Sequence, residues 1–191
     1  YRTNAQSRSM EEALRKMNIP YRIYGGLSFY KRKEIKDLLA YFRLVINSKD
    51  EEALKRIINV PARGIGKTTI EKMIVVAASE DKPMWELIEN PAYNPCGFNA
   101  GTWGRIQDFV TMIKSFAVKQ NVDNAYELAS HISTGSGLLR ELYQDKTPEG
   151  LSRYENVQEL LNGIKEFVET GRTITPLGDE DLYQDTGEVR T

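Results

Sequence analysis

The sequence predicts a mainly α-helical protein, preceded by a small strand-helix-strand piece of an α/β domain. From Lys31 to about residue 168, apolar residues recur at the spacing of amphipathic helices. Gly and Pro residues interrupt this pattern at intervals and indicate turns between the helices. Only the N-terminal residues show an alternating pattern that favours strands. We therefore expect one short mixed segment followed by a helical domain.

The N-terminal piece is expected to contain two strands around one helix. Residues 1–4 and 21–24 favour extended structure, and residues 6–17 place their apolar side chains on one helical face. Pro20 lies just past the helix, and Gly25-Gly26 closes the second strand. Strands joined through a helix in this way are expected to be parallel.

The helical part is expected to begin near Lys31 and to contain a series of short helices. Asp50 is a candidate N-cap for the second of them. Trp85 is expected in the core, and the Asn-, Pro- and Gly-rich residues 90–104 are expected to form a loop. After the first helix, which runs to about residue 46, we expect helices at 50–58, 68–79, 84–88, 105–119, 124–132, 138–143 and 153–168. In the last helix the expected buried residues are Val157, Leu160, Leu161, Ile164 and Phe167.

The near-neutral net charge of −1 conceals two oppositely charged halves. Residues 1–78 carry sixteen Lys and Arg against eight Asp and Glu, whereas residues 79–191 carry ten against nineteen. Such a basic half suits a polyanionic partner. Charged residues also decorate solvated helix faces in most proteins, so charge alone leaves both interpretations open.

Composition argues against several classes of protein. One cysteine, Cys96, cannot form an internal disulfide, and with the single His131 it does not supply a zinc ligand set. No apolar run is long enough to cross a membrane, so we expect no membrane partner. A single cysteine fits a reducing compartment, and a cytoplasmic location is expected. The residues show no catalytic constellation, and we expect neither catalytic residues nor a metal site in this chain.

The segment INVPARGIGKTT, residues 58–69, admits two interpretations. Its end, Gly66-Lys67-Thr68, matches the last residues of a nucleotide-binding phosphate loop. Such a loop needs another glycine five positions before Gly66, so that its amides can wrap around the phosphates. Pro61 stands at that position, and proline has no amide proton and a fixed φ. The spacing therefore argues against a phosphate loop.

The second interpretation is a turn that contacts a DNA backbone. Gly64 and Gly66 can take positive φ, which would let a partner approach the backbone closely. The helix that follows presents free amides and a positive dipole end, which suit phosphate oxygens. Arg63 and Lys67 add positive charge on either side. A plain helical corner, in which the glycines only permit the bend, remains an alternative.

Three stretches together resemble the UvrD/PcrA/Rep group of superfamily 1 DNA helicases. They are YRTNAQSR at residues 1–8, YGGLSFYKRKEIKD at 24–37 and the RGIG turn at 63–66. A weaker fourth is RYENVQEL at 153–160. The resemblance covers about residues 1–170, and the order and spacing of the stretches carry it.

The resemblance implies a division of the chain. Residues 1–47 would form the N-terminal part of the second RecA-like motor domain, and 48–170 a helical accessory subdomain called 2B that binds DNA. The acidic residues 171–191 would be a linker or partly disordered tail. The parent would be an ATP-dependent 3′–5′ DNA helicase in repair or replication. ATP and Mg would be needed by that parent, and no cofactor is expected within this piece.

The resemblance also implies binding residues. Contacts to single-stranded DNA are expected from Arg2, Asn4 and Arg8. Contacts to the duplex backbone ahead of the fork, independent of sequence, are expected from Arg63, Gly64, Ile65, Gly66, Lys67 and Thr68. The remaining motor domains of the same polypeptide are the other expected partner. A helical protein-interaction module and a nucleotide-binding enzyme remain the alternative functions.

Overall fold

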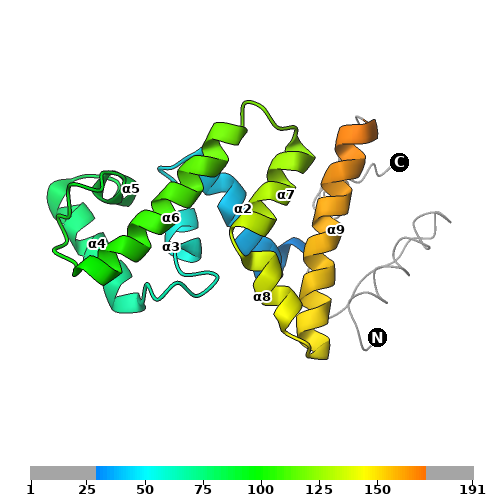
Figure 1. Ribbon diagram of the computed structural model, residues 1–191, viewed down its shortest axis with the longest axis horizontal. Coiled ribbons are helices and arrows are strands. Elements are labelled where there is room, and N and C mark those ends of the chain that lie inside the picture. The colour runs from blue at the N-terminus through cyan, green and yellow to red at the C-terminus, as the bar shows by residue number, and fades with distance from the viewer. Residues whose placement is uncertain (1–28, 171–191) are drawn as a thin grey trace, which may run out of the picture.

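The computed structural model describes residues 29–170, which form helices joined by short turns (Figure 1). No strand occurs within this range, which confirms the mainly helical prediction, while the strand-helix-strand piece expected before residue 27 lies outside it. The elements are η1 (Phe29–Lys31), α2 (Lys33–Ile46), α3 (Glu51–Ile57), α4 (Lys67–Glu80), α5 (Met84–Ile88), α6 (Ala100–Lys119), α7 (Ala125–Gly135), α8 (Leu138–Gln144) and α9 (Pro148–Thr170).

The core is built around α2. This helix packs against α3, α6, α7 and α9, and its Ile35, Leu38, Tyr41 and Leu44 are fully buried. Figure 1 shows α4 and α5 at one end of the described unit and α9 at the other, with the long α6 running between them. The domain boundary expected after residue 47 falls in the turn between α2 and α3, and helices on both sides of it share one hydrophobic core.

Local capping explains where several helices begin. The Asp50 carboxylate accepts a hydrogen bond from the Ala53 amide, which confirms Asp50 as the N-cap of α3. Asn124 caps α7 in the same way, and its own amide donates a hydrogen bond to the Glu127 carboxylate, which completes a capping box. These signals lie within four residues of each other in the sequence, so no distant contact is needed to set them.

Three expected boundaries were wrong. Helix α6 begins at Ala100 rather than at residue 105, because the Asn99 side chain caps it by accepting from the Thr102 amide. Helix α7 continues to Gly135, and α9 already begins at Pro148, a favourable first helical residue. Phe167, expected in the core, is 39 % exposed because α9 extends past the helices it packs against.

A buried polar link joins two stretches that are distant in the sequence. Asn156 on α9 accepts a hydrogen bond from the Arg32 guanidinium and donates one to the Glu34 carboxylate. Both Glu34 and Asn156 are only 6 % exposed, so the bonds replace the water that these groups lose on burial. The link fixes α9 against the start of α2.

None of the helices in residues 29–170 combines the length and the apolar character needed to span a membrane.

Candidate nucleic-acid interface

The turn between α3 and α4 holds the glycines singled out in the sequence. Gly64 has φ +71°, in the left-handed region that glycine tolerates best. Gly66 has φ −75° and ψ 171°, an extended conformation open to any residue, so the turn does not use the positive φ that glycine allows at this position. Gly66 instead serves as the N-cap of α4. The two glycines therefore have different roles in the turn.

Asn59 shapes the turn from its inner side. Its side-chain oxygen accepts hydrogen bonds from the amides of Arg63, at 2.8 Å, and of Ile65, at 3.1 Å. The Ile65 side chain is fully buried and anchors the tip of the turn in the core. Sequence reasoning missed Asn59, although an Asn just after a helix is a common turn-forming residue.

Arg63 directs its guanidinium into the protein, although the sequence suggested that it adds positive charge beside the turn. Its guanidinium donates to the backbone oxygens of Ile57 and Pro61, at 3.2 and 3.1 Å, and of Ser136, at 2.8 Å. It also donates to the Tyr41 hydroxyl at 2.6 Å and lies 5.4 Å from the Phe109 ring centroid. These groups come from α2, α3, α6 and the turn after α7. Arg63 therefore positions the turn, with both terminal nitrogens of its guanidinium bonded inside the protein.

Tyr41 is the second buried member of this network. Its hydroxyl donates to the Val60 carbonyl while accepting from Arg63. Burial raises the pKa of Tyr41 to about 12, although the nearby Arg63 charge acts in the opposite direction. The hydroxyl therefore stays protonated at neutral pH and keeps its donor role.

The outer surface of the turn is open to solvent. Gly64, Gly66, Lys67 and Thr68 are all exposed, and the Lys67 side chain is 90 % exposed. Its one ionic contact, with Glu71 at 3.6 Å, joins two exposed groups and contributes little. Within the described residues, the amides of Gly66, Lys67 and Thr68 meet no hydrogen-bond acceptor. Free donors thus face outward at this point.

Helix α4 begins differently from its neighbours. In the part of the chain described here, every other α-helix has an acidic residue in its first turn or, in α6, a capping Asn side chain. Helix α4 has neither, and its first residue is the cationic Lys67. A cation at the positive end of a helix dipole opposes stability. Departures of this kind from local stability rules are expected at functional sites.

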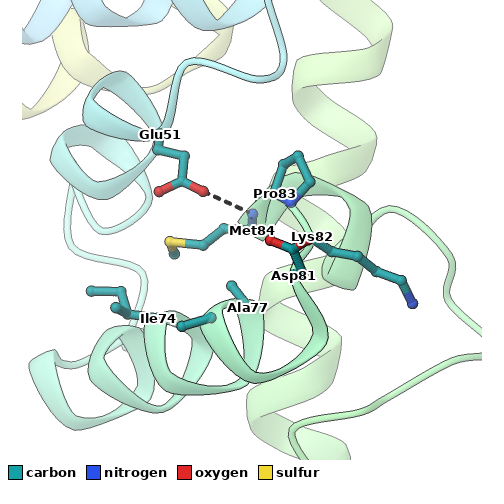
Figure 2. Close-up of a pocket in the computed structure, with 8 residues that line it drawn as sticks. Glu51, Ile74, Ala77, Asp81, Lys82, Pro83 and Met84 are labelled. Atoms are coloured by element: carbon teal, nitrogen blue, oxygen red, sulfur yellow. Dashed lines mark hydrogen bonds between the residues drawn. The ribbon is translucent and has the colours of Figure 1, made fainter.

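A separate hollow of about 370 Å³ lies near the other end of α4, between α3 and α5 (Figure 2). Glu51 on its wall accepts from the Met84 amide at 3.3 Å and pairs with Lys55 at 2.8 Å. The Lys55 hydrogen bond is the main cause of the lowered pKa of Glu51. Figure 2 shows the Lys82 side chain directed away from the hollow. The Glu51 carboxylate therefore has a structural role, since it links α3 to the start of α5.

The other candidate residues do not form a site in the described range. Residues 29–170 contain no cluster of His, Cys, Asp and Glu able to hold a metal ion. His131 packs edge-on against Phe116, and Cys96 is a buried free thiol. Arg2, Asn4 and Arg8, expected to contact single-stranded DNA, lie outside the described residues. The structure therefore brings together one candidate surface, the turn at residues 63–68.

Comparison with known proteins gives the family. Residues 1–178 match the family described as "UvrD-like helicase C-terminal domain". The ATP-dependent DNA helicase PcrA of Staphylococcus aureus (strain Mu50 / ATCC 700699) is 37 % identical over 182 residues, 95 % of this chain and 24 % of that protein. The protein of the same name from Staphylococcus epidermidis (strain ATCC 12228 / FDA PCI 1200) gives the same identity and coverage. This chain thus spans about a quarter of the length of these relatives.

The family match extends over both the N-terminal stretches and the helical unit that carries the turn, and it agrees with the resemblance found in the sequence motifs. The chain belongs to the family of UvrD-like helicase C-terminal domains.

Proposed function

We propose that this chain serves in an ATP-dependent DNA helicase, where its helical unit holds the duplex ahead of the fork. Its relatives carry the name ATP-dependent DNA helicase, and it spans a quarter of their length, so the whole activity is inferred from them. The observation that carries the proposal is the uncapped, cationic start of α4 beside an exposed left-handed glycine. Free amides and a positive helix end suit phosphate oxygens of any sequence.

Each residue of the proposed contact has a distinct role. The amides of Gly66, Lys67 and Thr68 would donate to phosphate oxygens, and the Lys67 ammonium would add a mobile positive charge. Gly64 would let the sugar-phosphate backbone of the duplex approach closely. Ile65 and Arg63 would hold the turn in place from its buried side. The amide donors contact only phosphates, which every sequence presents.

The N-terminal residues complete the proposal. Arg2, Asn4 and Arg8 would contact single-stranded DNA from a segment that belongs, with the residues up to 47, to the second motor domain. Residues 48–170 would act as the accessory subdomain and 171–191 as a linker. ATP and Mg would bind in the parent enzyme, between this motor domain and another of the same polypeptide. Unwinding would run 3′ to 5′ in DNA repair or replication.

Duplex binding by the 191-residue chain tests this proposal. A fluorescently labelled forked DNA should bind, with affinity that falls steeply as salt rises. The double variant Gly64→Val, Gly66→Val should weaken binding. Because a side chain at Gly64 is strained at positive φ, that loss could also come from a distorted turn. The single variant Gly66→Val is sharper, since no atom lies within 4 Å of the added Cβ and the backbone is extended. It should keep its helical content and lose affinity. If Gly66→Val binds the duplex as tightly as the parent chain, the turn is a plain helical corner and makes no DNA contact.

Two other functions make different predictions. A helical protein-interaction module would not bind DNA at physiological salt. A phosphate-loop enzyme would bind ATP in a manner that depends on Lys67, and a variant Lys67→Ala would abolish that binding. The turn follows helix α3, whereas a phosphate loop follows a strand, so the local geometry favours the DNA contact.

A further inference from the structure

We infer that Arg105, on α6, is a second arm of the duplex contact and grips a phosphate beside Gly64. This inference rests on the proposed function and adds a residue 41 positions further along the chain than Gly64. An ideal Cβ placed on Gly64 would lie 3.3 Å from the Arg105 Nη1 atom and 3.4 Å from its Cδ atom. The Arg105 side chain therefore lies over the exposed glycine, and its guanidinium shares a surface with the turn.

Arg105 has its full donor capacity available. The residue is exposed, and within the described residues it forms no hydrogen bond and no ion pair. Arg63, four residues before Lys67, has its guanidinium turned into the core and bonded there. The positive charge that sequence reasoning placed at Arg63 is thus supplied from another helix, by Arg105. A planar guanidinium with several donors is well suited to phosphate oxygens.

Glycine at position 64 also leaves space for the Arg105 side chain. A long exposed side chain normally loses conformational entropy when it binds, which reduces the gain from a contact. Three Arg105 atoms would lie 3.3–3.4 Å from a Cβ at position 64, so the side chain runs close to the backbone of the turn. A side chain at position 64 would crowd this stem and would also be strained at φ +71°. Glycine at 64 therefore serves both the backbone conformation and the placement of the arm.

A hollow of about 330 Å³ next to the arm limits where a phosphate can sit. Its walls include Arg63, Arg105, Asp108, Phe109 and Met112. Asp108 is exposed and negatively charged, and Phe109 is apolar, so the hollow itself does not suit a phosphate. Beside the hollow, at its rim, the Arg105 guanidinium lies next to the exposed Gly64. The duplex backbone is therefore assigned to this rim, with Asp108 as a nearby repulsive charge.

The test compares single-charge variants of the 191-residue chain in their binding to a labelled, blunt 20-base-pair duplex across a salt series. Arg105→Ala should weaken binding about fivefold at low salt, the effect of unit charges about 4 Å apart in water. The slope of log K against log salt should become shallower by about 0.9, the value for one lost phosphate contact. Arg105→Lys should retain most of the affinity and the full slope.

Lys119→Ala is the matched control, since it removes the same charge from the same helix. Fourteen residues further along α6, it lies about 21 Å from Arg105. Its affinity and slope should match the parent chain. If Arg105→Ala and Lys119→Ala behave alike, Arg105 makes no phosphate contact and the inference is wrong, while the turn itself can still bind. If the parent chain does not bind duplex at all, the proposed function fails first.

Asp108→Asn tests the same geometry with the opposite sign. Removing the repulsive carboxylate should raise duplex affinity about twofold, the effect of unit charges about 8 Å apart in water. In a chain that already carries Arg105→Ala, the duplex is no longer bound close to Asp108. The increase in affinity caused by Asp108→Asn should therefore be smaller in that chain. An equal or lower affinity for Asp108→Asn alone would mean that no phosphate approaches this rim, and it would overturn the assignment.

Discussion

Placing an acid at the N-cap of α4 should stabilise the protein and weaken its hold on DNA at the same time. Gly66 occupies the N-cap without a side-chain cap, in an extended conformation with no atom within 4 Å of an added Cβ. Gly66→Asp therefore fits without strain. Its carboxylate can accept from the second or third amide of the helix, as N-cap acids do. Those amides are the donors proposed to hold a phosphate.

The two effects have comparable and opposite magnitudes. An N-cap acid gains a few tenths of a kcal/mol over Gly and a further 0.3–1 kcal/mol, roughly, from the helix dipole. Replacing Gly in an allowed conformation adds about 0.4–1 kcal/mol through the unfolded state. The sum is about 1–2 kcal/mol, which corresponds to about 2–8 °C in Tm for a chain of this size. A carboxylate about 4 Å from a phosphate costs about 1 kcal/mol in water, which is about a fivefold loss of affinity.

The assay pairs thermal unfolding with duplex binding for three proteins: the parent chain, Gly66→Asp and Gly66→Asn. Asn has the shape and capping ability of Asp without its charge, so it separates occupation of the amides from repulsion. We expect Tm to rise in both variants, and affinity to fall more in Gly66→Asp, with the difference shrinking as salt is added. A Gly66→Asp variant that is more stable and binds duplex as well as its parent would refute the contact at these amides.

Three further predictions concern the inner side of the turn. Arg63→Ala should lower the free energy of unfolding by about 3 kcal/mol, because four internal hydrogen bonds are lost, and Arg63→Lys should not restore it. Denaturant titration measures the free energy of unfolding of both variants. If Arg63→Lys is as stable as the parent chain, the positive charge matters at position 63 and the hydrogen bonds do not. Asn59→Ala should lower the free energy of unfolding by about 1 kcal/mol and weaken duplex binding. Asn59→Asp keeps the acceptor oxygen and should retain most of the stability. Equal losses of stability in the two variants would contradict this role of Asn59. Because the pKa of Tyr41 is raised to about 12 in the folded chain, its contribution to stability is complete below about pH 10 and is lost as pH rises toward 12. The stability difference between the parent and Tyr41→Phe should therefore narrow over that interval, as followed by denaturant titration at several pH values, and a constant difference would contradict the raised pKa.

The features that could be predicted from sequence are those set by nearby residues. Asp50 caps α3 through the amide three residues later, and such a signal is visible in a short window. The start of α6 was missed because the glycines at 101 and 104 suggested a loop, whereas the Asn99 cap and the packing of the helix outweigh their low propensity. Helix ends are where local propensity and distant packing compete most evenly.

The direction of a side chain depends on groups that a short window does not contain. Arg63 and Lys67 both flank the glycines in sequence, yet one is bonded in the core and the other is almost fully exposed. The difference arises from Tyr41 and Ser136, which lie 22 residues before and 73 residues after Arg63. Arg105 approaches Gly64 for the same kind of reason. Local sequence therefore identified the turn but not which charges face outward.

The inner and outer sides of the turn also explain why a weak cap is retained at α4. Asn59, Ile65 and Arg63 fix the backbone from within, so the helix start needs no further support from its own first residues. A Ser, Asp or Asn at position 66 would add stability, but its side chain would occupy the amides that a phosphate needs. Gly66 and Lys67 give up about 1 kcal/mol of helix stability in return for open donors and a positive charge. On this argument the proposed binding surface coincides with the weakly capped start of α4, and the buried network behind it compensates for that weak cap.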